Sequence, residues 1–420
     1  MIGKSFLKDQ GKILFAGIGL AASAVAIKNV FDNPSRKYHG NVGQEYDAWT
    51  SEGILEHYWG DNIHLGYYSE KEQALGYTKK DFKKAKVDFI DEMFRFSGSQ
   101  SPRAVLDVGC GFGGSSRHLA RKFPDSTIIG ITLSAEQVKR ARELAAEQGL
   151  TNVHFFVMDA LYMDGSTPQN SEQKADVSFP PPSNIPALIT ELYTSCPSRT
   201  LSPLSSSAPD SSASDSSASP PPPRASPPAM SLPAETFDLV WACESGEHMP
   251  DKRRFVSQMS RVLRPAGNLV IACWCQRDSS APHSPPITAQ EQKELDFLYH
   301  EWAHPFFVSK EAFGRMLSEM GKEEGGGGDE GAEPGTAGKG ADGTFKNIQI
   351  QNWTRFTLPT WHHSILVGVW DPWIVLSKGP RIWYKTLREV VMIQRMHKAF
   401  AKGLMEYGMI SAVKAEKEGK

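Results

Sequence analysis

A single glycine-rich turn limits the possible folds of this chain more than any other part of it. The turn lies in the run Val105-Leu-Asp-Val-Gly-Cys-Gly-Phe-Gly-Gly-Ser-Ser116. The apolar start is typical of a buried parallel strand, and glycines let the backbone turn tightly and approach a ligand closely. Residues 115–122 continue as a predicted helix. A strand that ends in such a turn and opens a helix predicts an α/β fold that binds a ligand at the turn.

Strands and helices alternate through most of the chain. Apolar runs predict strands at 104–108, 127–133, 153–158, 237–242, 268–274, 345–353 and 409–413. Helices are predicted at 135–148, 252–263, 289–302 and 310–320, and a turn is predicted at 264–267. Ser134 is expected to cap the first of these helices, with Gln137 at the capping-box position. The alternation predicts a doubly wound, Rossmann-like sheet that binds ligands beyond the carboxyl ends of its strands.

Two segments interrupt this pattern. Residues 162–235 consist largely of Ser, Pro and Ala, and residues 321–344 are rich in Gly and Glu. Such compositions cannot bury enough apolar surface to offset the entropy lost on ordering. Both segments are therefore predicted to be flexible insertions in surface loops.

Near the N-terminus, residues 13–27 form an apolar run between Lys12 and Lys28. A helix of this length rises about 22 Å, which is less than the thickness of a hydrocarbon core of about 30 Å. The run fits a short membrane anchor, the core of a cleaved targeting signal, or a buried helix. The flanking lysines and the Gly and Ala content favour a membrane role.

The composition argues against two kinds of partner. The formal net charge is −2, so the chain lacks the broad basic field that nucleic acids require. The cysteine number is odd, which indicates reduced thiols rather than a disulfide framework. Cys273 and Cys275 are two residues apart, a spacing that suits neither a zinc knuckle nor a redox pair. We therefore expect no metal site; the five cysteines are Cys110, Cys196, Cys243, Cys273 and Cys275.

The residue before the glycines indicates which ligand the turn binds. Asp107 ends the first strand, and Gly109 and Gly111 follow at the turn. A carboxylate there would repel the pyrophosphate of a dinucleotide, but it suits a ligand with a cationic amino-acid group. S-adenosylmethionine (SAM) has such a group, so the sequence predicts a SAM site. The alternative is a tight turn that holds no ligand.

Polar residues also follow the other strands. Asp159 and Ala160 end the third strand, where a carboxylate can accept a hydrogen bond from an adenine amino group, and Glu244 ends the fourth. The second strand ends in Gly130-Ile-Thr-Leu-Ser134, without the acidic residue that usually binds ribose hydroxyls. Thr132, Ser134 or Gln137 would have to take that role.

Four segments together resemble a known family, the tocopherol-type methyltransferases. This family includes the γ-tocopherol methyltransferases and the cyanobacterial-type 2-methyl-6-phytyl-benzoquinol methyltransferases. The segments are Tyr46-Asp-x-Trp49 with Gly53-Ile-Leu-Glu-His-Tyr-Trp-Gly-Asp-Asn-Ile-His-Leu-Gly-Tyr-Tyr68; the glycine loop with Gly113-Gly-Ser-Ser-Arg117; Gly130-Ile-Thr-Leu-Ser134; and Phe237-Asp-Leu-Val-Trp-Ala-Cys-Glu-Ser-Gly-Glu-His-Met-Pro-Asp-Lys252. The family generally lacks both insertions, and residues 264–267 depart from its usual Pro-Gly-Gly.

The resemblance implies a class I SAM-dependent methyltransferase fold of seven strands, with an N-terminal lid and a helical substrate cap. The N-terminal apolar segment would span 1–30 and the lid 41–100. The two halves of the methyltransferase domain would span 101–161 and 236–320, with the Ser/Pro-rich insertion at 162–235 between them. The Gly/Glu-rich insertion would span 321–344, and the C-terminal strand with the cap 345–420. The lid around Tyr58, Trp59 and His64 would close over the cofactor. The residues expected to bind SAM are Asp107, Val108, Gly109, Cys110, Gly111, Gly113, Thr132, Leu133, Ser134, Gln137, Asp159, Ala160, Glu244, Tyr58 and Trp59.

The implied reaction is methylation of a ring carbon on a prenylated quinol or chromanol, in tocopherol or plastoquinone synthesis. A general base with a pKa near 7 would activate the phenol, which points to His248 or His64, with Glu247 as a second choice. The alternative role of His248 is to brace its loop. Aromatic rings can also stabilise a sulfonium through cation–π contact unless they are core residues; the candidates are Tyr58, Trp59, Tyr67 and Trp241.

A prenylated acceptor resides in a bilayer, so a membrane surface is an expected partner. Residues 361–400 mix tryptophans with basic residues, as interfacial segments do, although packing on the core would explain the same pattern. The insertions and the resemblance favour a plastid membrane. Two alternatives stay open: a SAM enzyme for a sterol, fatty acyl or alkaloid amine acceptor, and a SAM-binding protein without catalysis.

Overall fold

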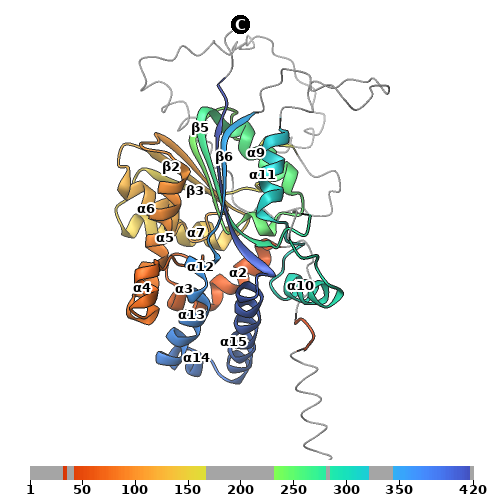
Figure 1. The fold of residues 1–420 in the computed structure, drawn as a ribbon. Coiled ribbons are helices and arrows are strands. Elements are labelled where there is room, and N and C mark those ends of the chain that lie inside the picture. Colours follow the sequence, from red (N-terminus) through yellow and green to blue (C-terminus); the bar gives the residue numbers. More distant parts are fainter. Residues whose placement is uncertain (1–31, 36–41, 167–230, 281–283, 321–343, 417–420) are drawn as a thin grey trace, which may run out of the picture.

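A seven-stranded sheet forms the centre of the molecule (Figure 1). The computed structural model describes residues 32–35, 42–166, 231–280, 284–320 and 344–416. The predictions for residues 1–30, for most of 162–235 and for nearly all of 321–344 lie outside this part of the chain. The strands are β1 (Ala104–Val108), β2 (Thr127–Thr132), β3 (Val153–Val157), β4 (Phe237–Cys243), β5 (Leu263–Gln276), β6 (Phe345–Asn352) and β7 (Met405–Lys414).

The strand order is β3-β2-β1-β4-β5-β7-β6, which confirms the predicted doubly wound fold. Strands β1 to β5 are parallel, and β7 runs antiparallel to both of its neighbours. The chain builds the sheet outward from β1 to β3 and then returns to place β4 on the other side of β1. The carboxyl ends of β1 and β4 therefore flank the switch point at which such sheets bind ligands.

Most strands match the predicted ranges within a residue, but β5 and β7 begin five and four residues earlier than predicted. Residues 264–267 were expected to be a turn before the fifth strand, but they belong to β5. The pairing of β4 with β5 shifts register between Phe237 and Leu239, and Ala266 has a φ of 58°. Residues 264–267 therefore lie opposite the single residue Asp238, in a wide bulge of β5 in which the backbone turns at Ala266.

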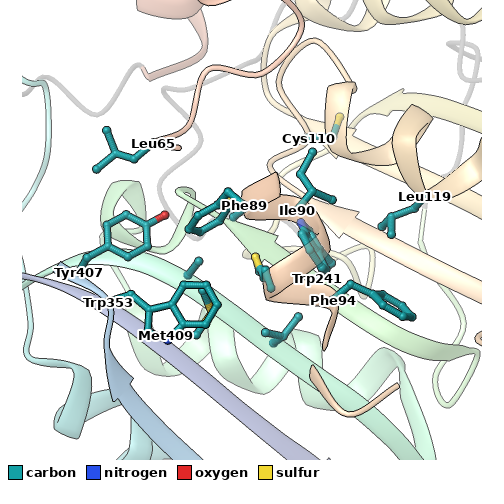
Figure 2. Packing of buried hydrophobic residues seen from close by; sticks show 14 of the residues in the cluster. Leu65, Phe89, Ile90, Phe94, Cys110, Leu119, Trp241, Trp353, Tyr407 and Met409 are labelled. Carbon is teal, nitrogen blue, oxygen red and sulfur yellow. The ribbon is translucent and has the colours of Figure 1, made fainter. Parts of the chain in front are cut away.

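Helices cover both faces of the sheet (Figure 1). One face packs against α5 (Phe82–Ser97), α6 (Gly114–Lys122) and α7 (Ala135–Glu147), and the other against α9 (Lys252–Val262) and α11 (Lys310–Glu319). Successive residues of β1 alternate between the two resulting cores, as a pleated strand requires. The first core includes the Trp241 ring, which is fully buried beside Ile90 and Phe94 (Figure 2).

The remaining helices gather at one end of the sheet and come from both ends of the chain (Figure 1). They are α2 (Val42–Glu52), α3 (Ile54–Trp59), α4 (Glu70–Ala74), α12 (Thr354–Thr357), α13 (Pro359–Trp370), α14 (Trp373–Ser377) and α15 (Pro380–Ala401). Helix α10 (Ala289–Glu301) shares the first core with residues of α13 and α15. No helix in the described ranges has the length and apolar character needed to cross a bilayer.

Candidate active site

A cavity of about 840 Å³ lies between the carboxyl ends of the parallel strands and the helices at that end of the sheet. Most residues predicted to form the site line it, although they come from distant parts of the sequence. They are His64, Glu247, His248, Asp107, Gly109, Cys110, Gly111, Thr132, Leu133, Ser134, Gln137, Asp159, Ala160, Glu244, Tyr58 and Trp59. The structure places two predicted residues, Val108 and Gly113, outside this lining.

Asp107 offers a buried carboxylate to the cavity. Its side chain is 1% exposed and accepts a hydrogen bond of 2.6 Å from Ser116 Oγ. Burial raises the pKa of Asp107 to about 7, and the bond from Ser116 opposes this shift only in part. Asn62 Oδ1, in the turn after α3, is a second buried acceptor at the cavity wall and has no partner among the described residues. Each of the two is a suitable acceptor for an ammonium group.

The glycine loop is held by close contacts that allow no side chain at two positions. Gly109 has a φ of 82°, and a Cβ there would lie 2.3 Å from the Cβ of Ser245. Gly113 has a φ of 73°, and its Cβ would lie 2.3 Å from the Phe155 ring. The Val108 carbonyl accepts a hydrogen bond from Ser245 Oγ. Val108 and Gly113 therefore shape the loop from behind the cavity wall.

At the end of β2 most polar groups are already engaged. Ser134 Oγ caps α7 by accepting from the Gln137 backbone N–H, and it donates to Asp47 on α2. The reciprocal half of the expected capping box is not formed, because Gln137 Oε1 accepts from Thr132 Oγ1 at 2.9 Å. Gln137 Nε2 is buried at the cavity wall without a partner in the described chain. Of the three residues expected to bind the ribose hydroxyls, Gln137 is the one whose side-chain donor is not already used in a hydrogen bond within the described chain.

The ends of β3 and β4 supply two further carboxylates. Asp159 accepts a hydrogen bond of 2.8 Å from the Leu161 backbone N–H, and burial raises its pKa. Glu244 Oε1 accepts from the Leu65 backbone N–H and from the Tyr407 hydroxyl, both at 2.8 Å. Burial also raises the pKa of Glu244. Because these bonds join β4, β7 and the segment after α3, Glu244 fixes how the lid segment lies against the sheet.

Glu247 is a buried carboxylate with one oxygen that has no hydrogen-bond partner among the described residues. It lies in the short helix η2 (Gly246–His248) and is 2% exposed. Its Oε1 accepts a long bond of 3.4 Å from the Trp274 backbone N–H, whereas Oε2 has no hydrogen-bond partner among the described residues. Burial raises the pKa of Glu247, and the nearby charge of Glu244 raises it further. Lys252 donates to the Glu247 backbone carbonyl, and burial lowers the pKa of this lysine to about 8.

The histidines differ from the expected base with a pKa near 7. His248 Nε2 lies 3.0 Å from the Tyr46 hydroxyl, and burial lowers the pKa of His248 to about 3. Burial likewise lowers the pKa of His64 to about 4, and its Nδ1 bonds the Leu65 carbonyl. Both rings are therefore neutral at physiological pH, because the closed site offers their charged forms too little solvation.

His304, which the sequence pattern did not reveal, stacks on His248 with a centroid distance of 4.2 Å and an interplanar angle of 18°. It is buried at the cavity wall, and its Nδ1 has no partner in the described part of the chain. Burial lowers its pKa well below the usual value. His304 follows Ala303, whose φ of 53° turns the chain after α10 toward the site. A lone histidine in a loop gave no periodic or motif signal.

The aromatic residues around the cavity are only partly those predicted. Tyr58 and Trp59 line it, but Tyr67 stacks on Phe356 and Trp241 belongs to the core (Figure 2). Trp274 and Trp302 line the cavity in their place, with ring centroids 5.7 Å apart. Trp241 lies two residues before the end of β4, and its ring packs into the first core instead of reaching the cavity.

Away from the sheet the cavity wall becomes mainly apolar, although Ser364, Lys385, Thr386 and Glu389 also line it. This part is formed by α13, α14 and α15, through Ile365, Val369, Val375, Leu376, Trp383, Leu387, Val390, Met392 and Ile393. The cavity thus has a polar inner end and an apolar outer end. Among the described residues no group of three His, Cys, Asp or Glu side chains is placed to hold a metal, and Cys110, Cys243, Cys273 and Cys275 are free thiols.

The fold and the site together define an α/β enzyme for a nucleoside cofactor that carries a cationic amino-acid group. Residues 77–323 match the family model described as a methyltransferase domain. The chain is 33% identical over 377 residues to the 2-methyl-6-phytyl-1,4-hydroquinone methyltransferase of Synechocystis sp., covering 89% of this chain and 87% of the relative. The chain therefore belongs to the SAM-dependent methyltransferases.

Other relatives extend the range of acceptors. The chain is 27% identical to the chloroplastic tocopherol O-methyltransferase of Arabidopsis thaliana, covering 86% of this chain and 79% of the relative. It is 25% identical to norajmaline N-methyltransferase of Rauvolfia serpentina, covering 89% and 98%. Among solved structures, geranyl diphosphate C-methyltransferase from Streptomyces coelicolor A3(2) is similar with a TM-score of 0.53 at 15% identity, covering 91% of this chain and 99% of that chain. At that identity the similarity shows the fold alone.

Proposed function

We propose that this methyltransferase methylates a ring carbon of a prenylated quinol or chromanol, as a step in tocopherol or plastoquinone synthesis. The observation that carries the proposal is the shape of the cavity, which joins a cluster of carboxylates and imidazoles to an apolar wall on the cap helices. A phenolic head group suits the first part and a prenyl chain suits the second. The names of the relatives from Synechocystis and Arabidopsis support the same class of acceptor.

In this proposal the inner cavity holds the cofactor. SAM supplies an electrophilic methyl group on a sulfonium. Asp107 and Asn62 would accept hydrogen bonds from its ammonium group, Gln137 Nε2 would donate to the ribose, and Asp159 would accept from the adenine amino group. Positioning and the exclusion of water supply most of the rate for such an in-line transfer. The helices α2 and α3, which line the cavity opposite the sheet, act as the lid.

The acceptor hydroxyl lies beside Glu247 in this scheme. Glu247 Oε2 takes the phenolic proton, and the electron pair left on oxygen makes the ring carbon more nucleophilic. Once the methyl group is bonded to that carbon, the hydrogen of the carbon leaves as a proton to solvent, and the proton held by Glu247 returns to the oxygen, which restores the aromatic phenol. The carboxylate suits this role better than the two histidines predicted from sequence, since burial raises its pKa and lowers theirs. Neutral His248 and His304 orient the phenol through hydrogen bonds.

We further propose that the enzyme acts at a membrane, in a plastid of a photosynthetic organism. The chloroplastic relative supports this location, and a prenyl chain requires a bilayer. The lid, the domain halves and the cap would keep the bounds predicted from sequence.

The test is transfer of a labelled methyl group to three acceptors: a phytylated quinol, a tocopherol and an alkaloid amine of the kind named by the Rauvolfia relative. We expect label on a ring carbon of the quinol or chromanol. Label on the amine alone would assign the alternative acceptor class, and SAM binding without transfer to any of them would indicate a non-catalytic protein. The His248→Ala variant should bind SAM normally and lose turnover if His248 orients the phenol.

A further inference from the structure

The tip of the cap exposes an unusual amount of apolar surface. Of eleven large exposed apolar side chains in the described part of the chain, seven lie between residues 369 and 387. The rings of Trp370 and Trp373 are the most exposed, at 80% and 72%. This segment is the end of a helical hairpin in which α14 joins α13 to α15, and it projects away from the sheet (Figure 1). We name it the cap tip; its exposed apolar residues are Val369, Trp370, Trp373, Leu376, Trp383, Tyr384 and Leu387.

The chemistry of the cap tip fits a bilayer surface. Tryptophan and tyrosine prefer the boundary between hydrocarbon and headgroups, where the ring is buried and its polar atom stays hydrated. Lys378 and Arg381 are exposed within the same segment, and basic side chains there favour lipid phosphates. Lys385 is already neutralised by Glu52, and Asp371 pairs with His57. Apolar insertion therefore dominates the expected binding, with a smaller electrostatic part.

The cap tip is continuous with the acceptor site. Val369, Leu376, Trp383 and Leu387 are exposed and also line the cavity. The apolar wall of the cavity thus reaches the exposed surface, where the Lys385–Glu52 ion pair also lines the cavity. Trp370, Trp373 and Tyr384 lie outside the lining, so the surface beyond the mouth can be altered separately from the cavity.

We propose that the cap tip docks on a lipid bilayer and that the acceptor enters the cavity directly from the membrane at this mouth. The prenyl chain then stays among the lipids and on the apolar wall, while the ring reaches Glu247. The route of entry rests on the proposed function, because it requires a lipid acceptor. The docking of the cap tip does not.

The docking is tested on the full chain with phosphatidylcholine vesicles whose acyl chains carry bromine, which quenches nearby tryptophan fluorescence. The W370S/W373S variant should lose about tenfold or more in vesicle affinity and most of the quenching. The control L75S/I350S removes two exposed apolar residues outside the cap and should match the unaltered protein. Equal quenching of the two variants would overturn the proposal. The same result is expected if the N-terminal apolar run alone holds the chain on the vesicle, so that case also counts against docking by the cap tip.

Turnover distinguishes the route from the reaction. With a phytylated quinol embedded in vesicles, W370S/W373S should turn over about tenfold more slowly than the control, because fewer molecules are docked. With the same ring on a short, water-soluble prenyl chain, both should match the unaltered protein. Equal rates on vesicles would refute entry from the membrane while leaving the proposed function intact. If no prenylated acceptor is methylated, the proposed function fails, and the quenching still decides the docking.

Discussion

Replacement of Asp107 by Asn tests the cofactor site most directly, because it removes one charge and almost no volume. The carboxylate is buried and has one hydroxyl partner, so the cofactor's ammonium group would provide most of the interaction that offsets the cost of burying its charge. Removing one member of a buried, hydrogen-bonded charge pair costs about 2–5 kcal/mol. We therefore expect D107N to bind SAM about thirty- to several-thousand-fold more weakly.

The pH dependence of binding gives a second readout. Burial holds the pKa of the ligand-free carboxyl at about 7, whereas a bound ammonium requires the ionised form. Affinity should thus be constant above pH 7 and fall about tenfold for each pH unit below it. Binding at pH 7 should release about half a proton from this group. Calorimetry in two buffers of different ionisation enthalpy measures that release, which D107N should lack.

The same group has the opposite effect on the stability of the ligand-free protein. The folded-state pKa is raised from the usual 3.8 to about 7, so this stability contribution is present below pH 4 and is lost as the pH rises through 7. The ionised carboxyl then costs the folded state about 4 kcal/mol. D107N should melt at a higher temperature than the unaltered protein at pH 8 and at nearly the same temperature at pH 4.

The control is D164N, which alters an exposed carboxylate outside the cavity and should leave SAM affinity unchanged. An unchanged affinity and proton release in D107N would refute the assignment of the ammonium to Asp107. A destabilised D107N at pH 8 would refute the claim that burial raises this pKa.

Three further predictions concern packing and catalysis. Gly113→Ala places a Cβ against a buried ring at a φ of 73° and should lower the melting temperature strongly, whereas Gly149→Ala, at a φ of 65° in open space, should cost about 1–2 kcal/mol in urea titrations. Glu301→Gln breaks a buried ion pair with Arg388 and should lower the free energy of unfolding by about 3–5 kcal/mol in the same titrations. A double variant that replaces both residues by apolar ones should recover much of this stability, because no unpaired charge is left buried. If the double variant recovers none, the unpaired charge is not the cause. Because burial raises the pKa of Glu247, turnover should increase with pH through that pKa, and E247Q should be slow and lack the increase in a pH–rate profile.

The sequence predicted the parts of this protein that depend on neighbouring residues. The β1 strand, the glycine turn and the cap of α7 by Ser134 follow from local apolar runs, glycine conformations and side-chain-to-backbone bonds. The alternation of elements then placed the ends of β1 to β4 at one edge, so most of the residues expected to bind the cofactor line one cavity. The bulge in β5 was missed because it depends on the register of the adjacent β4.

Only the tertiary structure decided which side chains face the cavity and how they titrate. Tyr46 meets His248 across 202 positions of sequence, and His304 comes from a loop with no pattern of its own. Trp241 stands beside the predicted site in sequence, yet its side chain points into the core. Hydrophobic periodicity reports burial along one element, whereas contacts between elements, and the desolvation that shifts a pKa, arise when the elements pack together.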